Sequence, residues 1–153
     1  MISPCIGLFL WGKIEKKRSQ YMVKRIKPFA FAFILGAVLY TALEILWRGW
    51  SHWSMTVTGG ACLAGLYGLK LGMKRKPRLF FCILGGLLIT TAEFVAGCIV
   101  NMLLGWDVWD YSRVKGNLWG QVCLPYTVLW IMLALPAGYL CDRIQGYFSD
   151  NNR

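Results

Sequence analysis

Charged side chains are scarce in this sequence, and acidic residues and histidine are the scarcest. The 153 residues include 7 Asp and Glu and one His, and charged residues make up 16% of the chain against 57% hydrophobic residues. This composition excludes an intrinsically disordered chain, and it is too apolar for an ordinary soluble domain of this length. It therefore predicts a protein that is solvated mainly by lipid.

Sequence motifs of common catalytic and metal sites are absent as well. The chain has no GxxxxGK[ST], no GxSxG and no HExxH, so ATP hydrolysis, serine hydrolysis and zinc-protease chemistry have no visible machinery. Six cysteines include no CxxC pair, and we expect them to be small apolar packing residues. The single histidine, His52, is expected to be an interfacial polar residue. We predict a non-enzymatic protein with no cofactor and no metal.

Four apolar runs are each long enough to cross the ~30 Å hydrocarbon core of a bilayer. They cover Phe29–Trp47, Met55–Met73, Leu79–Leu104 and Leu118–Leu140. The second run is the weakest, because it holds five glycines and Lys70, which we expect to snorkel to the membrane surface. A re-entrant segment is the alternative there. Four spans with short loops use almost the whole sequence and leave no room for a soluble catalytic domain.

Basic residues are distributed unevenly along the chain. Of 17 Lys and Arg, seven precede the first run, five surround the second connection, three lie in the other two connections and two follow the last run. Because basic residues favour the cytoplasmic side, we expect both termini in the cytoplasm and a multi-pass protein of the bacterial inner (plasma) membrane. The formal net charge of +10 then reflects topology, and no nucleic-acid partner is expected.

This pattern predicts three regions. A basic cytoplasmic or interfacial segment covers residues 1–28, a four-helix transmembrane domain covers 29–141, and a cytoplasmic tail covers 142–153. An internal repeat adds detail, since a shift of 49 residues aligns residues 34–44 with 83–93 at six identical positions of eleven. We predict an all-α polytopic membrane protein whose four transmembrane helices form two parallel two-helix repeats. Chance similarity between Leu- and Gly-rich spans is the alternative.

The repeat pairs two acidic residues, Glu44 and Glu93. Each lies 14 or 15 residues beyond the start of its run, which is roughly 21 to 22 Å along a helix. Because an ionised carboxylate in a membrane costs about 2.5 to 3.5 kcal/mol or more, we expect both to face the bundle interior, to be protonated, or to pair with Arg48, His52, Lys70 or backbone donors. Two acids at one depth favour a site for a proton, a cation or an amine, and carboxyls that only tie helices together are the alternative.

The third connection combines aromatic, acidic and amide side chains. Its candidate binding residues are Trp109, Asp110, Tyr111 and Asn117. Aromatic rings that alternate with carboxylates can line a vestibule for a cation or a sugar. Anchoring at the membrane interface explains the same rings without a ligand.

Three stretches of the second half resemble a known family. They are Thr91-Ala92-Glu93, Trp109-Asp110-Tyr111-Ser112, and Asn117 to Leu124 followed by Trp130. In these the chain resembles the small bacterial membrane proteins labelled "putative ABC-transporter type IV", or CmpB-like permeases, over roughly residues 36–130. The first half departs from the family, because residues 58–65 lack the two prolines of its Gly-Pro-x-x-Pro stretch. The resemblance implies a transport function and importance for Glu93, Trp109, Asp110, Tyr111, Asn117 and Gly120.

We therefore expect a transport-related protein in which Glu44 and Glu93 bind a proton or a cationic solute. Its partners are the lipid bilayer and either further copies of the chain or a partner ATPase. A non-transporting scaffold or regulatory subunit, in which the acids only lock helices together, is the second hypothesis. A third, an intramembrane enzyme with Glu93 and Asp110 as acid and base, lacks a basic phosphate-binding cluster on the outer face.

Overall fold

The computed structural model describes residues 4–73 and 76–150, with side chains from Ile26 onward. Helices dominate it, which confirms the all-α prediction. In chain order the elements are α1 (Pro4–Arg48), α2 (Trp53–Gly72), α3 (Arg78–Gly97), the π-helix η1 (Cys98–Leu103), β1 (Asn117–Leu118), β2 (Val122–Cys123) and α4 (Leu124–Asp150). The two short strands pair antiparallel, with Leu118 opposite Val122.

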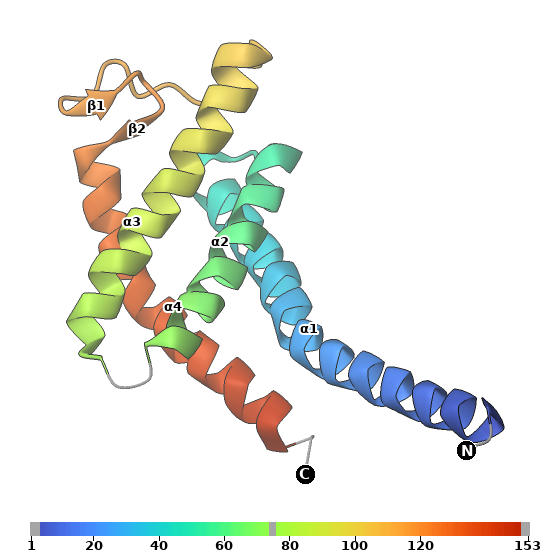
Figure 1. Cartoon of the computed structure of the whole chain (residues 1–153). Coiled ribbons are helices and arrows are strands. Elements are labelled where there is room, and N and C mark those ends of the chain that lie inside the picture. Colours follow the sequence, from blue (N-terminus) through green and yellow to red (C-terminus); the bar gives the residue numbers. More distant parts are fainter. Residues whose placement is uncertain (1–3, 74–75, 151–153) are drawn as a thin grey trace.

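The helices form an up-and-down bundle (Figure 1). Helices α1 and α3 run toward the end that carries β1 and β2, and α2 and α4 run back from it. We call these the hairpin end and the opposite end. Helix α1 packs mainly on α2, and α3 packs mainly on α4, while α2 also contacts α3 and α4. Two helical hairpins therefore lie side by side, in the order that the repeat predicts, although the repeat itself stays a prediction.

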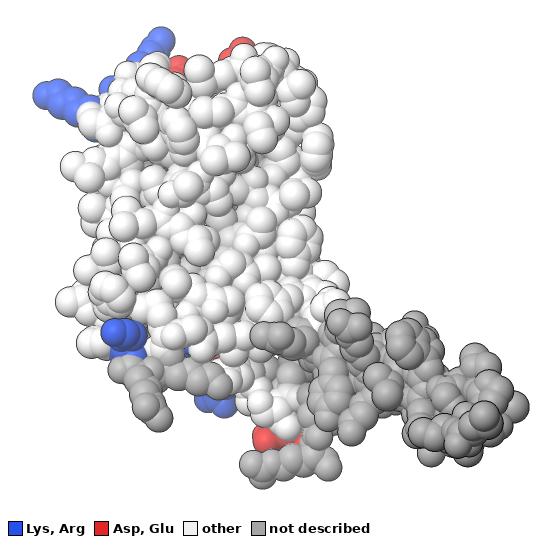
Figure 2. Space-filling view, in the orientation of Figure 1, with Lys and Arg blue, Asp and Glu red and all other residues white. Residues whose placement is uncertain are grey.

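Three helices are long and apolar enough to cross a membrane. These stretches are Ile26–Arg48, Arg78–Leu103 and Leu124–Asp150. Charged side chains on the visible face of the molecule lie near its two ends, and the region between is uncharged (Figure 2). Helix α2 is an unbroken helix of 20 residues but is not among these three. The structure thus supports a membrane protein, and a fourth span formed by α2 stays a prediction.

Several predicted boundaries differ from the observed ones. The last helix begins at Leu124 and not at Leu118, because residues 117–123 turn through the β-hairpin. Positive φ angles at Gly116, Trp119 and Gly120 are incompatible with a continuous right-handed helix. Helix α4 also continues through residues 142–150 of the predicted tail. Helix α1 passes through Pro28 without a break, so no loop separates the basic segment from the first span.

Part of the predicted topology signal lies outside the described residues. Lys74, Arg75 and Arg153 fall in the gaps, and the side chains of the basic residues from Lys13 to Arg25 are likewise outside the description. The interfacial role predicted for the segment before the first span therefore stays a prediction.

Glycines set the closest helix contacts. A Cβ on Gly59 of α2 would lie 2.3 Å from Tyr40 Cβ of α1, and one on Gly36 would lie 2.7 Å from the Gly59 carbonyl oxygen. In the second hairpin, a Cβ on Gly86 would lie 2.7 Å from the backbone of Ile131. These distances exclude any side chain, so glycine allows the backbones to pack directly. The core between the helices forms around residues such as Leu66 and Ala134.

Candidate functional site

Glu93 lies inside the bundle, on the face of α3 that is turned toward α4. Only 3% of the residue is exposed. The indole nitrogen of Trp130 on α4 donates a hydrogen bond to Glu93 Oε2 at 2.7 Å, and the Tyr111 hydroxyl donates to Oε1 at 3.4 Å. The prediction that this acid faces the interior is confirmed. Its partners come from α4 and from the loop before the β-hairpin, which closes over it.

Aromatic rings surround this carboxylate. Tyr111 stacks on Tyr126 with ring centroids 4.7 Å apart, and Tyr126 lies 6.4 Å from Trp130. Tyr40 of α1 contributes the opposite wall, 6.1 Å from Trp130. Burial, followed by the nearby charge of Glu93, raises the pKa of the Tyr111 hydroxyl. That hydroxyl therefore stays protonated at neutral pH and acts as a donor.

Glu44 forms a second polar group with its neighbours at the end of α1. Its Oε1 lies 2.9 Å from Arg48 Nη2, one helical turn away, and its Oε2 accepts a 2.6 Å hydrogen bond from Ser51. The Arg48 guanidinium also lies 4.5 Å from the centre of the Trp50 ring, and its Nη1 reaches the Val108 carbonyl at 3.4 Å. Of the partners predicted for the acidic residues, Glu44 therefore pairs with Arg48.

Glu93 and its two donors form one group. We call Glu93, Tyr111 and Trp130 the polar centre. Among the described residues Arg48 pairs with Glu44, and no ion pair involves Glu93.

The loop that closes the polar centre is held by amide side chains. Asn101 of η1 donates to the Trp109 carbonyl at 3.0 Å and to Gln121 Oε1 at 2.8 Å, while its own oxygen accepts from the Val108 amide. The Trp109 indole donates to the Gln121 carbonyl at 2.8 Å, and Trp109 is buried. A Cβ on Gly97 would lie 2.5 Å from Gln121 Oε1, so glycine is needed for this packing. Trp109 therefore positions the loop.

Asp110 and Asn117 shape the turns of the same loop. Both oxygens of Asp110 accept hydrogen bonds from Ser112, one from its amide and one from its hydroxyl, and these bonds lower the pKa of the Asp110 carboxyl. Asn117 donates to the carbonyls of Ser112 and Val114 and accepts from the amide of Gly120. Of the six predicted binding residues, the structure joins Glu93 and Tyr111 by a hydrogen bond, whereas Glu44 pairs with Arg48 and Ser51. Trp109, Asp110 and Asn117 hold the loop, and a binding role for all six stays a prediction.

Most of the described tryptophans lie near the hairpin end with exposed rings. Trp47, Trp50, Trp53, Trp106 and Trp119 are between 42% and 79% exposed. His52 caps α2, since its ring nitrogen accepts from the Ser54 amide at 3.3 Å, and its ring packs between Trp53 and Trp106. This arrangement agrees with aromatic anchoring at a membrane interface.

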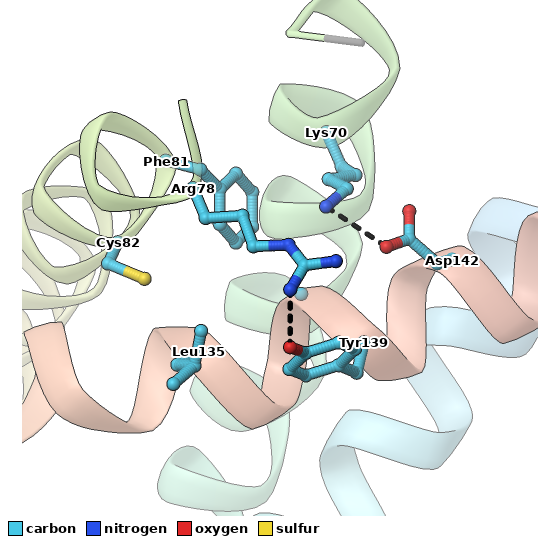
Figure 3. Close-up of a pocket in the computed structure, with 8 residues that line it drawn as sticks. Lys70, Arg78, Phe81, Cys82, Leu135, Tyr139 and Asp142 are labelled. Carbon is cyan, nitrogen blue, oxygen red and sulfur yellow. Dashed lines mark hydrogen bonds and ion pairs between the residues drawn. The ribbon is translucent and has the colours of Figure 1, made fainter. Parts of the chain in front are cut away.

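A second group of charged residues lies at the opposite end (Figure 3). Lys70 of α2 forms a 3.1 Å ion pair with Asp142 of α4, and its ammonium lies 5.0 Å from the Phe81 ring. Arg78 donates to the Tyr139 hydroxyl at 2.7 Å and covers its ring. The space between them holds only about 10 Å³, roughly one water. Lys70 therefore joins two helices across the bundle in addition to being near its surface.

The described cysteines act as packing residues, as predicted. All five are free thiols, and four of them, Cys62, Cys82, Cys123 and Cys141, are buried. Cys5 lies outside the described side chains. No group of three or more metal-ligating side chains gathers among the described residues.

Four residues of the site were not selected from the sequence. Tyr40 lies one turn before Glu44, so helical spacing alone would have placed it on the same face. Trp130 was noticed only through the family resemblance. Gln121 lies in the stretch that carries the family resemblance but was not selected, and nothing in the sequence singled out Asn101, its hydrogen-bond partner 20 residues away.

The fold and the site define a polytopic α-helical membrane protein with a buried polar centre. A family model described as "Putative ABC-transporter type IV" matches residues 31–150, and the chain belongs to this family. The match spans all the described residues named in the site. No curated protein and no solved structure matched.

Proposed function

We propose that this chain is the membrane-embedded, permease-like subunit of a transport system and binds a proton or a cationic solute at Glu93. The observation that carries the proposal is a carboxylate that is 3% exposed, lies inside a membrane bundle and pairs with no described cation. An acidic residue inside a membrane protein is expensive and usually marks an ion or substrate path. The family name adds an ATPase as a proposed partner, and further copies of the chain are the alternative.

In this proposal α2 also crosses the membrane, so that the protein has four spans, and both termini are cytoplasmic. Helix α2 is as long as α3, and eight of its residues are buried, so its polar backbone and small side chains are largely covered by the other helices. The opposite end carries Lys70, Lys76 and Arg78, which favours the cytoplasmic side of a bacterial inner membrane. The protein performs no catalysis and needs no cofactor or metal of its own.

The test is proton flux in proteoliposomes that contain a pH-sensitive dye. The protein is purified from its own membrane with any stoichiometric ATPase that accompanies it, identified by native mass spectrometry, and ATP is supplied if one is found. We expect Glu93→Gln, alone or with Glu44→Gln, to lower flux at least about tenfold while expression stays normal. The amide still accepts from Trp130 but cannot exchange a proton.

The control is Asp107→Asn, the same chemical change on the exposed loop. It should keep wild-type flux, because asparagine tolerates the positive φ of 46° at this position. Unchanged flux in Glu93→Gln would remove the carboxyl from the mechanism.

A scaffold or regulatory subunit is the second candidate, and one observation favours it. Glu44 and Glu93 both have partners within the chain, so both can act as links between helices and loops. This role predicts that Glu93→Gln lowers the melting temperature strongly and that even the wild-type protein shows no flux.

A further inference from the structure

A small pocket at the opposite end of the bundle differs in its lining from a larger apolar groove. The groove lies between α1 and α4, has a volume of about 320 Å³ and has no charged residue in its lining. The small pocket lies between α2, α3 and α4, and its lining includes Lys70, Arg78 and Asp142 (Figure 3). Charged side chains from three helices therefore converge on this pocket, which we call the basic pocket.

Positive charge exceeds negative charge at the basic pocket. The one carboxylate in its lining, that of Asp142, already pairs with Lys70 at 3.1 Å. Arg78 forms no ion pair with any described residue. Lys76, two residues earlier in the chain, is exposed and forms none with them either. An anion at the pocket would therefore meet positive charge that no described acid neutralises.

Arg78 and Tyr139 hold hydrogen-bond donors that the described part of the chain leaves unused. A guanidinium has five N–H donors, and the recorded bond of Arg78 is the one to the Tyr139 hydroxyl, at 2.7 Å. That hydroxyl accepts the bond and keeps its own proton to donate. Tyr139 is 49% exposed, so its hydroxyl can be reached from outside. A planar guanidinium matches the oxygens of a phosphate group, because two parallel N–H donors can bond to two oxygens.

Apolar residues extend the basic pocket toward the middle of the bundle. Cys82 lies one turn after Arg78 on α3, and Leu135 lies one turn before Tyr139 on α4, and both line the pocket. Because α3 runs away from this end and α4 runs toward it, both lie deeper in the bundle than the charges. The enclosed space of about 10 Å³ holds roughly one water, so a phosphate group would lie across the mouth of the pocket.

We propose that the basic pocket binds the head group of an anionic phospholipid. Arg78 and Tyr139 donate to the phosphate oxygens, Lys70 adds positive charge, and an acyl chain lies along Leu135. Basic pockets between transmembrane helices are typical sites for such head groups. Charge selects an anionic lipid, because a zwitterionic head group brings an ammonium that Arg78 and Lys70 repel. The inference goes beyond the proposed function and does not depend on transport or on Glu93.

The test is a lipid titration followed by native mass spectrometry in a neutral detergent. It uses the full-length protein with any partner ATPase that co-purifies. The probes are dioleoylphosphatidylglycerol and dioleoylphosphatidylcholine, which share their acyl chains and differ in head-group charge. The first phosphatidylglycerol should bind about fivefold more tightly or better, because its head group lacks the ammonium. Inorganic phosphate, a soluble source of the same chemistry, should not compete, because it has no acyl chains.

Two variants and one control locate the site. Arg78→Gln removes the charge and most donors at the mouth, and it should weaken phosphatidylglycerol binding about tenfold or more. Tyr139→Phe keeps the ring and every charge, and it should weaken binding about threefold or more. The control is Arg143→Gln, which removes the same charge from an exposed residue of α4 outside the pocket lining and should bind like the wild type. Melting temperatures without added lipid verify that each variant is folded.

Other outcomes overturn the inference. Equal affinity for the two lipids, or equal losses in Arg78→Gln and Arg143→Gln, would show that general surface charge attracts the lipid. Competition by inorganic phosphate would assign the pocket to a soluble anion. Selective lipid binding at Arg78 without flux would contradict the transport proposal alone, and Glu93-dependent flux without selective lipid binding would contradict the pocket alone.

Discussion

At the scale of single residues, Trp130 is the contact on which the polar centre depends most. Its indole provides the short hydrogen bond to Glu93, at 2.7 Å, and its ring packs near Tyr40 and Tyr126. The position of Glu93 in the interior followed from the cost of a charge in lipid. Its donors could not be predicted, because Tyr111 is 18 residues and Trp130 37 residues away along the chain.

Replacing Trp130 by phenylalanine should lower the melting temperature of the purified protein. The change keeps an aromatic ring but removes the donor, and a buried carboxylate that loses a partner costs about 1–3 kcal/mol. Thermal unfolding in detergent measures the effect, with Trp47→Phe as the control, because Trp47 is 79% exposed. Equal melting temperatures for the two variants would show that this hydrogen bond does not contribute to stability.

At the scale of helices, glycine decides which pairs pack together. The apolar runs predicted α2, and α3 together with η1, to within a few residues at each end, since long hydrophobic stretches are a strong signal. The run that begins at Leu118 hid a β-hairpin, because Leu118, Val122 and Cys123 are as apolar as the helix that follows. Among the glycines of α2, Gly59 packs directly on Tyr40, whereas Gly72 has open space around it.

Gly59→Ala should destabilise the bundle, whereas Gly72→Ala in the same helix should not. A methyl group at position 59 would overlap Tyr40, and overpacking of this kind costs about 1–3 kcal/mol. At position 72 the methyl group meets nothing within 4 Å, so the higher helix propensity of alanine can stabilise α2 by up to about 1 kcal/mol. Melting temperatures of the two variants measure the difference, and equal effects would argue against direct packing of α1 on α2.

At the scale of the whole molecule, the two ends of the bundle differ in chemistry. The hairpin end carries the exposed tryptophans and the loop that closes the polar centre. The opposite end carries Lys70, Arg78 and their partners, and both described chain ends lie on the side away from the hairpin (Figure 1). This difference makes the proposed orientation testable.

Single cysteines placed before and after α2 in the chain should be accessible to a maleimide from opposite sides of the membrane. In a protein whose native cysteines are replaced by alanine, Trp50→Cys and Lys115→Cys should react with an impermeant maleimide on intact cells. Lys76→Cys should react only after the membrane is opened. Reaction of Trp50→Cys and Lys76→Cys from the same side would show that α2 does not cross the bilayer.

The sequence by itself determined that this is a helical membrane protein and that its acidic residues avoid lipid, because both conclusions follow from the cost of placing charge and polar backbone in hydrocarbon. It also located the apolar helices and the aromatic loop. Only the tertiary structure decided that Trp130 and Tyr111 donate hydrogen bonds to Glu93 and that Glu44 forms an ion pair with Arg48. It also decided that a groove lies between α1 and α4. These features depend on which helix faces pack together, and that is set by contacts between residues distant in the sequence.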